Sequence, residues 1–406
     1  MSAGSESKEM SLHTKSVHSG DRKRTGASVP VTTPIHTAVS HFYDDVETLD
    51  KVFAHEIDGP SYGRYSNQTT AALEKQIATL ENGAGALATS SGMSAIHMAL
   101  TAAIADRRRN VLAASALYGA TIGMLTKVFE PTGVEVNFVD FNDLEAVAEA
   151  IAEHKPGALL METVSNPLLR VAPLDKIAEL AKSSGAALIV DATFSTPRVI
   201  RPLEYGATYV VHSLTKYFSG HGDVLGGVVI ANEPEITQLH TLSRTVGFVL
   251  GPFESYLAMR GCKTFALRME RQCQNAAIVA KALAANPLIS KVHFTGNPDH
   301  PDAETIARLF DPGHYGAMIA FEVGDGANAA DRARIFRIMN ALRMIVAATS
   351  LGDVHSMVLY PPIASHRDLS PKHRARLGIH DNLIRLSIGI EDPADIVADL
   401  DQALSA

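Results

Sequence analysis

Residues 210–227 read VVHSLTKYFSGHGDVLGG, and they place a single lysine, Lys216, just after an apolar run. That run is β-branched and aromatic, which is typical of the end of a buried strand. Ser213 and Thr215 lie beside the lysine, and several glycines follow it. A solvated surface lysine needs no such surroundings. A lysine that forms a Schiff base does, because its amine must be partly desolvated and must leave room for a planar ligand.

The sequence on both sides of this stretch alternates between strand-like and helical patterns. Helical spacing of apolar residues occurs in DLEAVAEAIAEH (143–154) and LDKIAELAKSSG (174–185). Strand-like apolar runs occur at 86–91, 110–115, 134–140, 157–163, 186–193, 209–213 and 225–231. Strands that alternate with helices predict a mostly parallel, doubly wound sheet that is covered on both faces. We expect one large α/β domain at residues 67–266.

The rest of the chain predicts two further units. Residues 1–66 are polar, contain many turn signals and lack the pattern of a long helix, so we expect an N-terminal arm that contacts a neighbouring subunit. A helical stretch (253–287) leads out of the large domain. A smaller α+β domain at residues 267–406 is predicted by strand-like runs at 291–296, 317–323, 344–352 and 383–390 and by helical patterns at 329–342 and 392–405.

Composition narrows the classes of function. The 406 residues are 46% hydrophobic and 20% charged, with a formal net charge of −8 and no basic tail, which disfavours nucleic acid as a partner. The two cysteines, Cys262 and Cys273, are typical of a protein with reduced thiols. No apolar run approaches the roughly 18 residues of a membrane span, and the N-terminus lacks a hydrophobic signal core. We therefore expect a soluble, cytoplasmic protein with no membrane partner.

Candidate ligand-binding residues follow five of the predicted strands at their carboxyl ends, where ligands bind in open parallel sheets. They are the turn Ser91-Gly92-Met93 at a helix start, Tyr118, Asn166, Asp191 with Thr193, and Lys216. Each has a simpler explanation on its own, such as a helix N-cap for the small residues and the carboxylate, or a loop position for the tyrosine. One ligand, pyridoxal phosphate, accounts for all five together.

The phosphate of this cofactor has matching groups at two strand ends. It would bind the backbone amides of Gly92 and Met93, where the helix dipole favours an anion. The hydroxyls of Ser213 and Thr215 would complete the phosphate site.

The ring of the cofactor also has matching groups. It would stack on Tyr118, Asp191 would pair with the pyridinium nitrogen, and Lys216 would hold the aldehyde, so that the cofactor serves as an electron sink. Other cofactors fit less well. A nicotinamide would need a G-x-G-x-x-G turn after the first strand, and none occurs there. We expect no metal, because the sequence has neither H-E-x-x-H nor paired C-x-x-C.

Seven motifs along the chain carry a family resemblance. They are SSGMSAI (90–96), LYG (117–119), SNP (165–167), VDATFSTP (190–197), VVHSLTKYFSGHGDVLGG (210–227), SLGD (350–353) and IRLSIGIED (384–392). Together they resemble the Cys/Met-metabolism pyridoxal-phosphate enzymes, which include cystathionine γ-synthases, cystathionine γ- and β-lyases, methionine γ-lyases and O-acylhomoserine sulfhydrylases. The likeness runs from about residue 14 to the C-terminus. It implies fold type I, an amino-acid substrate and a homotetramer built of two tight dimers with shared active sites.

The resemblance assigns roles to residues beyond the strand ends. Tyr62 and Arg64, in YGRYSNQT, match arm residues that reach the cofactor phosphate of the neighbouring subunit, although the residues alone indicate a surface loop. Arg385 matches the arginine that binds the substrate α-carboxylate through two hydrogen bonds. Ser350 matches the residue that assists this arginine in binding the substrate.

One further residue, Glu162, and three already named are expected close to the cofactor. Glu162 and Asn166 match positions near its phenolic oxygen. Ser91 and Thr193, at the strand ends described above, complete the expected cofactor-binding set.

The implied reaction is a γ-elimination on a homoserine-type amino acid whose γ-substituent is linked through C–S or C–O, such as cystathionine or canavanine. Lys216 would move the Cα proton and Tyr118 would protonate the leaving group. The alternative is a γ-replacement synthase, either a cystathionine γ-synthase or an O-acylhomoserine sulfhydrylase, and HGDVLGG (221–227) leans toward the synthases. A non-catalytic relative that uses the fold only for binding is disfavoured. Asp191 and Arg385 are both present, as are Lys216 and Tyr118, the two residues that would move protons.

Three positions depart from the family pattern. Ala120 follows LYG where the methionine γ-lyases carry a cysteine, which ranks methionine low as a substrate. Ala192 stands where an asparagine is common beside the ring-binding aspartate. His355 stands where many members have a glutamate that helps to recognise the distal part of the substrate. We therefore expect a substrate with an atypical distal group, which includes canavanine and the O-acylhomoserines.

Overall fold

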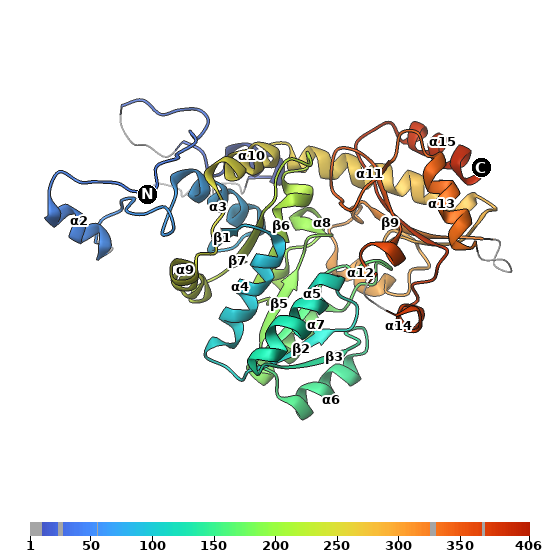
Figure 1. Cartoon of the computed structure of the whole chain (residues 1–406), viewed down its shortest axis with the longest axis horizontal. Helices are drawn as coiled ribbons and strands as arrows, with labels where there is room; N and C mark the ends of the chain where they lie inside the picture. The colour runs from blue at the N-terminus through green and yellow to red at the C-terminus, as the bar shows by residue number, and fades with distance from the viewer. Residues whose placement is uncertain (1–9, 23–26, 55, 325–329, 368–369) are drawn as a thin grey trace, which may run out of the picture.

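A seven-stranded sheet forms the centre of the chain (Figure 1). The computed structural model describes residues 10–22, 27–54, 56–324, 330–367 and 370–406. The strands are β1 (Gly85–Thr89), β2 (Asn110–Ala114), β3 (Glu135–Val139), β4 (Ala158–Glu162), β5 (Ala187–Asp191), β6 (Tyr209–Ser213) and β7 (Gly227–Ala231). Each coincides with one of the seven predicted strand-like runs, so these strand predictions are confirmed.

The sheet is mostly parallel, as predicted. Its strand order is β1-β7-β6-β5-β4-β2-β3, and the pairs from β6 to β3 are all parallel. β7 runs antiparallel to both of its neighbours, β1 and β6. Those two neighbours therefore point the same way, and the carboxyl ends of β1, β6, β5, β4 and β2 lie along one edge of the sheet. This shared edge positions the site.

The helices around this sheet bury amphipathic faces against it. In α7 (Leu174–Ser184) the buried residues are Leu174, Ile177, Ala178 and Ala181, which is the spacing of one helical face. The helix ends at Gly185, whose φ of +73° is the left-handed conformation that favours glycine. The other helices of this part are α3 (Gln68–Glu81), α4 (Gly92–Ala105), α5 (Gly119–Met124), α6 (Leu144–His154), α8 (Thr196–Val199), α9 (Glu235–Val246) and α10 (Pro252–Cys262).

A second sheet of five strands lies beside the first, with the order β10-β11-β12-β9-β8. Its strands are β8 (Ile289–His293), β9 (Met318–Val323), β10 (Val346–Ala347), β11 (Met357–Leu359) and β12 (Leu383–Ser387). Its helices are α13 (Arg332–Ala341), α14 (Pro371–Arg376) and α15 (Pro393–Leu404). The helix α12 (Ala303–Leu309), between β8 and β9, instead buries Ile306 and Leu309 in the core of the large sheet. The short β11 and the helix α12 were not predicted from the sequence, and β10 is much shorter than the run at 344–352.

One long helix, α11 (Phe265–Ala285), joins the two parts (Figure 1). Its first turns, with Phe265 and Met269, pack in the core of the large sheet. Its later turns, with Val279 and Leu283, pack in the core of the small sheet. The helix therefore shares its buried face between two cores. The boundaries at 66/67 and 266/267 stay predictions.

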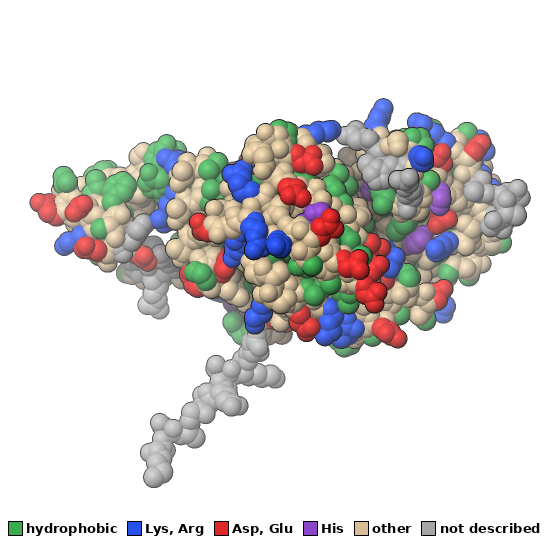
Figure 2. Space-filling view, turned by 90° about the horizontal axis from the view of Figure 1, so that it is seen from below, with side chains coloured by type: hydrophobic (Ala, Val, Ile, Leu, Met, Phe, Trp, Pro, Cys, Tyr) green, Lys and Arg blue, Asp and Glu red, His purple; other side chains and the backbone are tan. Residues whose placement is uncertain are grey.

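In the N-terminal segment, α1 (Leu12–His18) packs against α3 and α11, whereas the part that contains α2 (Val46–Phe53) projects from the body at the left of Figure 1. The described residues of the segment form these two short helices and a β-bridge between Ser40 and Tyr62. Several of its apolar side chains are open to solvent, among them Phe42, which is 89% exposed. Hydrophobic side chains are visible on this projecting end in Figure 2. Within the described ranges, no helix is long and apolar enough to cross a lipid bilayer.

Candidate active site

A cavity of about 420 Å³ lies at the shared edge formed by the carboxyl ends of five strands. The predicted residues that line it are Ser91, Gly92, Met93, Tyr118, Asn166, Asp191, Thr193, Ser213, Thr215, Lys216 and Arg385. Glu162, which the family resemblance had singled out, lines it as well. The structure thus brings together residues that are separated by up to about three hundred positions in the sequence.

Lys216 sits in a short π-helical turn (Leu214–Phe218) directly after β6. Its backbone departs from helical geometry there, with φ −98° and ψ −128°. Its Nζ donates a hydrogen bond of 3.0 Å to Oγ of Ser350, and no carboxylate pairs with it among the described residues. Burial, together with the positive charge of Arg385, lowers the pKa of Lys216 to about 8. The amine is therefore available in its neutral, nucleophilic form near physiological pH.

Arg268, on α11, binds the backbone of the turn that carries Lys216. Its buried guanidinium donates to the carbonyls of Tyr217 (2.7 Å), Phe218 (3.0 Å) and Gly261 (3.0 Å). A Cβ at Gly220 would lie 2.0 Å from Nη1 of Arg268, and the φ of Gly220 is +67°. This glycine therefore makes space for an arginine rather than for a planar ligand, which corrects the explanation given above for at least part of the glycine-rich stretch.

The start of α4 forms an anion-binding turn at the cavity. Ser91 caps the helix, because its hydroxyl accepts a hydrogen bond of 3.1 Å from the amide of Ser94. The amides of Gly92 and Met93 belong to the first turn and have no partner within the helix. A Cβ at Gly92 would lie 3.0 Å from Cβ of Ser213 on β6, so only glycine lets the helix start approach that strand. Free amides and the helix dipole both favour an anion here.

The two threonines of the predicted set also hold the loops that carry the site. The Thr215 hydroxyl accepts from the amide of Gly226 (3.0 Å) and donates to its carbonyl (3.3 Å). The Thr193 hydroxyl accepts from the amide of Ser213 (2.9 Å). Both residues therefore fix the positions of neighbouring turns, in addition to lining the cavity.

Two carboxyls, Asp191 and Glu162, stand side by side at the ends of β5 and β4. Burial raises the pKa of both, and the charge of Asp191 raises that of Glu162 further. Asp191 accepts from the amide of Thr193 (2.9 Å), and Glu162 accepts from the amide of Tyr118 (2.6 Å). Among the described residues, no lysine or arginine forms an ion pair with Asp191. The cation that the sequence predicted for this carboxylate is thus left for a ligand to supply.

Arg385, on β12, brings the small sheet into the cavity. It is only 4% exposed, its Nη1 donates to Oδ1 of Asn166 (2.9 Å), and its Nη2 donates to the carbonyl of Ser350 (3.4 Å). Its Nε is buried without a hydrogen-bond partner, and its guanidinium lies 5.8 Å from the ring centre of Phe194. Burial lowers the pKa of this guanidinium to about 10. A buried cation with a free N–H and no bonded carboxylate is a binding site for an anion.

Four predicted residues are not among those that line this cavity. One of them, Ser350, contacts two that do, because its hydroxyl accepts a hydrogen bond from Lys216 and its carbonyl accepts one from Arg385. The other three are Tyr62, Arg64 and His355. Tyr62 and Arg64 lie on the projecting arm, where the guanidinium is 5.6 Å from the tyrosine ring centre. His355 is exposed, and its Nδ1 is 3.1 Å from Oδ1 of Asp353. The roles given to these three residues stay predictions.

Sequence reasoning passed over several residues that shape the site, among them Phe194 and Arg268. Phe194 was inside the quoted motif VDATFSTP, directly after Thr193, so its position was available as a signal. Arg268 had no such signal, because a single arginine in a helical pattern predicts a solvated side chain. No cluster of histidine, cysteine and carboxylate groups arranged to hold a metal ion occurs in the described part of the chain.

The comparisons with known proteins identify the family. The family model described as "Cys/Met metabolism PLP-dependent enzyme" matches residues 13–405. The chain belongs to this family. The resemblance found in the sequence is therefore confirmed, and so is fold type I. The protein is a pyridoxal-phosphate-dependent enzyme of trans-sulfuration chemistry that acts on amino acids.

Individual relatives in the Cys/Met-metabolism family carry different activities. An L-methionine gamma-lyase of Fusobacterium nucleatum subsp. polymorphum is 37% identical over 402 residues, which cover 98% of this chain and 99% of the relative. A cystathionine gamma-synthase of Mycobacterium bovis is 38% identical over 394 residues, with 96% of each chain covered. The solved cystathionine gamma synthase of Xanthomonas oryzae pv. oryzae, in complex with aminoacrylate and cysteine, matches with a TM-score of 0.89 and 32% identity over 98% of each chain.

The cavity of this chain fits the family's cofactor. The free amides of the α4 turn suit a phosphate, and the unpaired, buried Asp191 suits a pyridinium nitrogen. The amine of Lys216 has a lowered pKa, as attack on an aldehyde requires.

Proposed function

We propose that this enzyme catalyses γ-elimination from an amino acid with a C–S or C–O linked γ-substituent. The observation that carries the proposal is the placement of Arg385, a buried guanidinium with an unpartnered N–H, in the same cavity as the lowered-pKa amine of Lys216. An α-amino acid has the two groups that match, because its carboxylate would bind the guanidinium while its amine faces the lysine.

The cofactor would be held by groups already described. The amides of Gly92 and Met93 and the hydroxyl of Ser213 would bind the phosphate, and Asp191 would accept a hydrogen bond from the ring nitrogen. When bound, pyridoxal phosphate withdraws electrons from the amino-acid carbons and so acidifies the protons at Cα and Cβ.

The chain supplies the groups that move these protons. Lys216 is the base that we assign to the Cα proton, because its amine is neutral in a large share of molecules when its pKa is about 8. Tyr118, the residue before α5, lines the cavity and is 41% exposed, so its phenol can follow a leaving group that departs toward solvent. We assign it the protonation of that leaving group.

The distal part of the substrate stays open between several candidates. Cystathionine and canavanine are the substrates that we propose first, with O-acylhomoserines next. Ala120 lies exposed in the first turn of α5, and Ala192 is fully buried behind Asp191. Replacing His355 with glutamate tests its predicted part in recognition. The ratios of catalytic efficiency among substrates should change, and unchanged ratios would remove His355 from the site.

A γ-replacement reaction is the second candidate, because a cystathionine gamma-synthase is among the relatives at 38% identity. Lys216, Tyr118 and Arg385 would keep the roles proposed above. A thiol would take the place of water in the second half of the reaction. The two functions differ only in whether product formation needs an added nucleophile.

We also propose that the arm packs on a second copy of the chain, within a homotetramer. Its support is the apolar surface of the arm, where Val31 is 76%, Phe42 89% and Val46 75% exposed. Burial of such side chains is favourable by about 25 cal/mol for each Å² removed from water. Tyr62 and Arg64, on this arm, would then complete the phosphate site of the partner.

One experiment separates the two reactions. The purified enzyme is incubated with cystathionine, methionine, canavanine, and O-acetyl- and O-succinylhomoserine, each with and without cysteine or sulfide, and products are identified by mass spectrometry. A 2-oxo acid formed without thiol supports γ-elimination. Turnover that requires the thiol and yields a thioether or homocysteine contradicts it and establishes replacement. The Lys216→Ala variant is the control for reactions that the free cofactor performs alone.

A further inference from the structure

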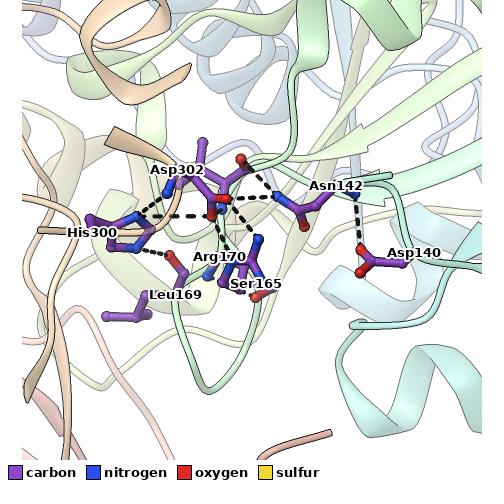
Figure 3. Close-up of polar contacts among 8 residues, drawn as sticks. Asp140, Asn142, Ser165, Leu169, Arg170, His300 and Asp302 are labelled. Carbon is purple, nitrogen blue, oxygen red and sulfur yellow. Dashed lines mark hydrogen bonds and ion pairs between the residues drawn. The ribbon is translucent and has the colours of Figure 1, made fainter. Parts of the chain in front are cut away.

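The buried carboxylate of Asp302, outside the active-site cavity, accepts four hydrogen bonds (Figure 3). Asp302 is 9% exposed, and Arg170 binds it through two of them, Nε to Oδ2 at 2.7 Å and Nη2 to Oδ1 at 2.8 Å. The amide of Val171 (2.8 Å) and the side-chain amide of Asn142 (3.2 Å) donate the others. The backbone amide of Asp302 donates to Nδ1 of His300. This arrangement is a two-point ion pair, which fixes direction as well as distance.

Arg170 also closes a tight loop that begins just after β4. The amide of Ser165 donates to the carbonyl of Arg170 (2.9 Å), and the amide of Arg170 donates back to the Ser165 hydroxyl (3.0 Å). Leu169, inside the loop, adopts a φ of +58°, which is unfavourable for a leucine and so needs support from its surroundings. The ion pair with Asp302 is attached at the end of this loop.

The loop carries Asn166, the residue that orients the substrate-binding arginine. Asn166 is 5% exposed, and its Oδ1 accepts the 2.9 Å hydrogen bond from Arg385. The second hydrogen bond of that guanidinium, to the carbonyl of Ser350, is 3.4 Å long. The direction of Arg385 therefore depends mainly on where the loop places Asn166.

The 165–170 loop also borders a second cavity. This cavity of about 1230 Å³ lies between the two sheets, and residues 165–168 and Arg170 line it. Asp302 is the residue before α12, in the segment between β8 and β9, and residues 296–301 of that segment line the same cavity. The ion pair therefore ties the loop to the segment that leads into α12.

We propose that Arg170 and Asp302 are positioning residues for the amino-acid carboxylate: they hold the 165–170 loop so that Asn166 aims Arg385. The inference rests on the proposed role of Arg385 in binding an α-carboxylate. Neither residue lines the cavity of the active site, so each acts through the loop.

The chain offers a matched control for a purely structural ion pair. Arg308, on α12, binds Asp175, on α7, through Nε to Oδ2 at 2.9 Å and Nη2 to Oδ1 at 3.1 Å. This pair has the same two-point geometry and also links α12 to the large sheet, but it has no hydrogen bond to the 165–170 loop. A general effect of weakening the contact of α12 with the large sheet should appear in both pairs.

The test measures equilibrium binding to the holoenzyme by the change in its visible absorption spectrum. The probes are L-norvaline, which lacks a γ leaving group, and n-butylamine, which is the same molecule without the carboxylate. The variants are Arg170→Gln, Arg170→Lys and Arg308→Gln, and thermal denaturation of each establishes that it is folded. Should Arg170→Gln not fold, Arg170→Lys replaces it, because it keeps the charge and loses only the two-point geometry.

We expect Arg170→Gln to raise the Kd of norvaline by about tenfold or more, as displaced positioning groups do. The Kd of butylamine should be unchanged, Arg170→Lys should lie between wild type and Arg170→Gln, and Arg308→Gln should bind both probes as wild type does. Equal effects on both probes, no effect on either, or the same norvaline effect from Arg308→Gln would overturn the inference.

The same measurements keep this inference distinct from the proposed reaction. A wild-type enzyme that does not prefer norvaline over butylamine refutes the carboxylate role of Arg385, and the positioning role falls with it. A wild-type enzyme that prefers norvaline but eliminates from no substrate refutes only the γ-elimination, and the positioning result still stands.

Discussion

The lowered pKa of Lys216 gives a prediction for the enzyme after removal of its cofactor. Burial of the amine, with the charge of Arg385 as a second cause, lowers this pKa from an ordinary 10.5 to about 8. At pH 8 about half of the lysine amines should then be neutral, against about 0.3% for an unperturbed lysine. Because only the neutral amine is a nucleophile, we expect an enhancement of about 150-fold in the reactive fraction at this pH.

Competitive labelling measures this fraction directly. The cofactor-free enzyme is exposed to trace acetic anhydride at a series of pH values, and acetylation of the Lys216 peptide is quantified by mass spectrometry against a surface lysine. The labelling rate should level off above a midpoint near pH 8. Arg385→Gln removes the smaller of the two causes, so its midpoint should lie higher, though below that of the surface lysine. A rate for Lys216 that still rises about tenfold per pH unit up to pH 10 would refute the reasoning.

The same pKa makes a statement about stability. Between pH 8 and 10.5 the unfolded chain keeps a proton on Lys216 that the folded chain has lost, so the free energy of unfolding should rise with pH across this window. The full difference corresponds to roughly 3 kcal/mol. Lys216→Met removes the titrating group, and urea denaturation of both cofactor-free proteins should show this rise only in the wild type. Parallel pH profiles would contradict it.

Three further predictions concern single residues. Arg385→Lys keeps the charge but loses the two-point geometry, so KM for the amino acid should rise by about 10- to 100-fold with a smaller change in kcat; steady-state kinetics decide. Gly220→Ala places a Cβ 2.0 Å from Arg268 Nη1 at a φ of +67°, so unfolding should cost about 3 kcal/mol less. Gly133→Ala, at a φ of +84° with open space, should lose only about 1 kcal/mol, and equal losses in urea denaturation would exclude the clash. Phe42→Ser should shift the protein to smaller assemblies in size-exclusion chromatography with light scattering, and an unchanged mass would remove the arm from the interface.

The large sheet and most of its ligand-facing residues could be predicted from local pattern. Apolar runs separated by helical spacing fix strand positions, and the rule that ligands bind at the carboxyl ends then selects Tyr118, Asp191 and Lys216. The antiparallel direction of β7 could not be predicted in this way, because the apolar pattern of a strand is the same whether it runs parallel or antiparallel to its neighbours. One signal was available. Among the described elements no α-helix lies between β6 and β7, and because parallel neighbours need a long crossover connection, this indicates an antiparallel pair.

Contacts between distant parts of the chain could not be predicted in this way. Arg385 alone looks like a surface residue of a strand, yet the structure buries it, and its partner Asn166 lies 219 positions earlier. Arg170 and Asp302 are 132 positions apart, and neither lies in a motif. The family resemblance supplied the role of Arg385 but not the loop that aims it.

The position of Arg385 in the chain has a consequence for biosynthesis. β12 is the middle strand of the small sheet, yet it follows the other four strands in the sequence. Until it is made, β9 and β11 lack the hydrogen-bonding partner that lies between them. The nascent polypeptide can already expose Lys216 and the α4 turn, but it lacks the arginine for the amino-acid carboxylate. Competence toward substrate thus arrives only after β12 has been made and has paired with β9 and β11.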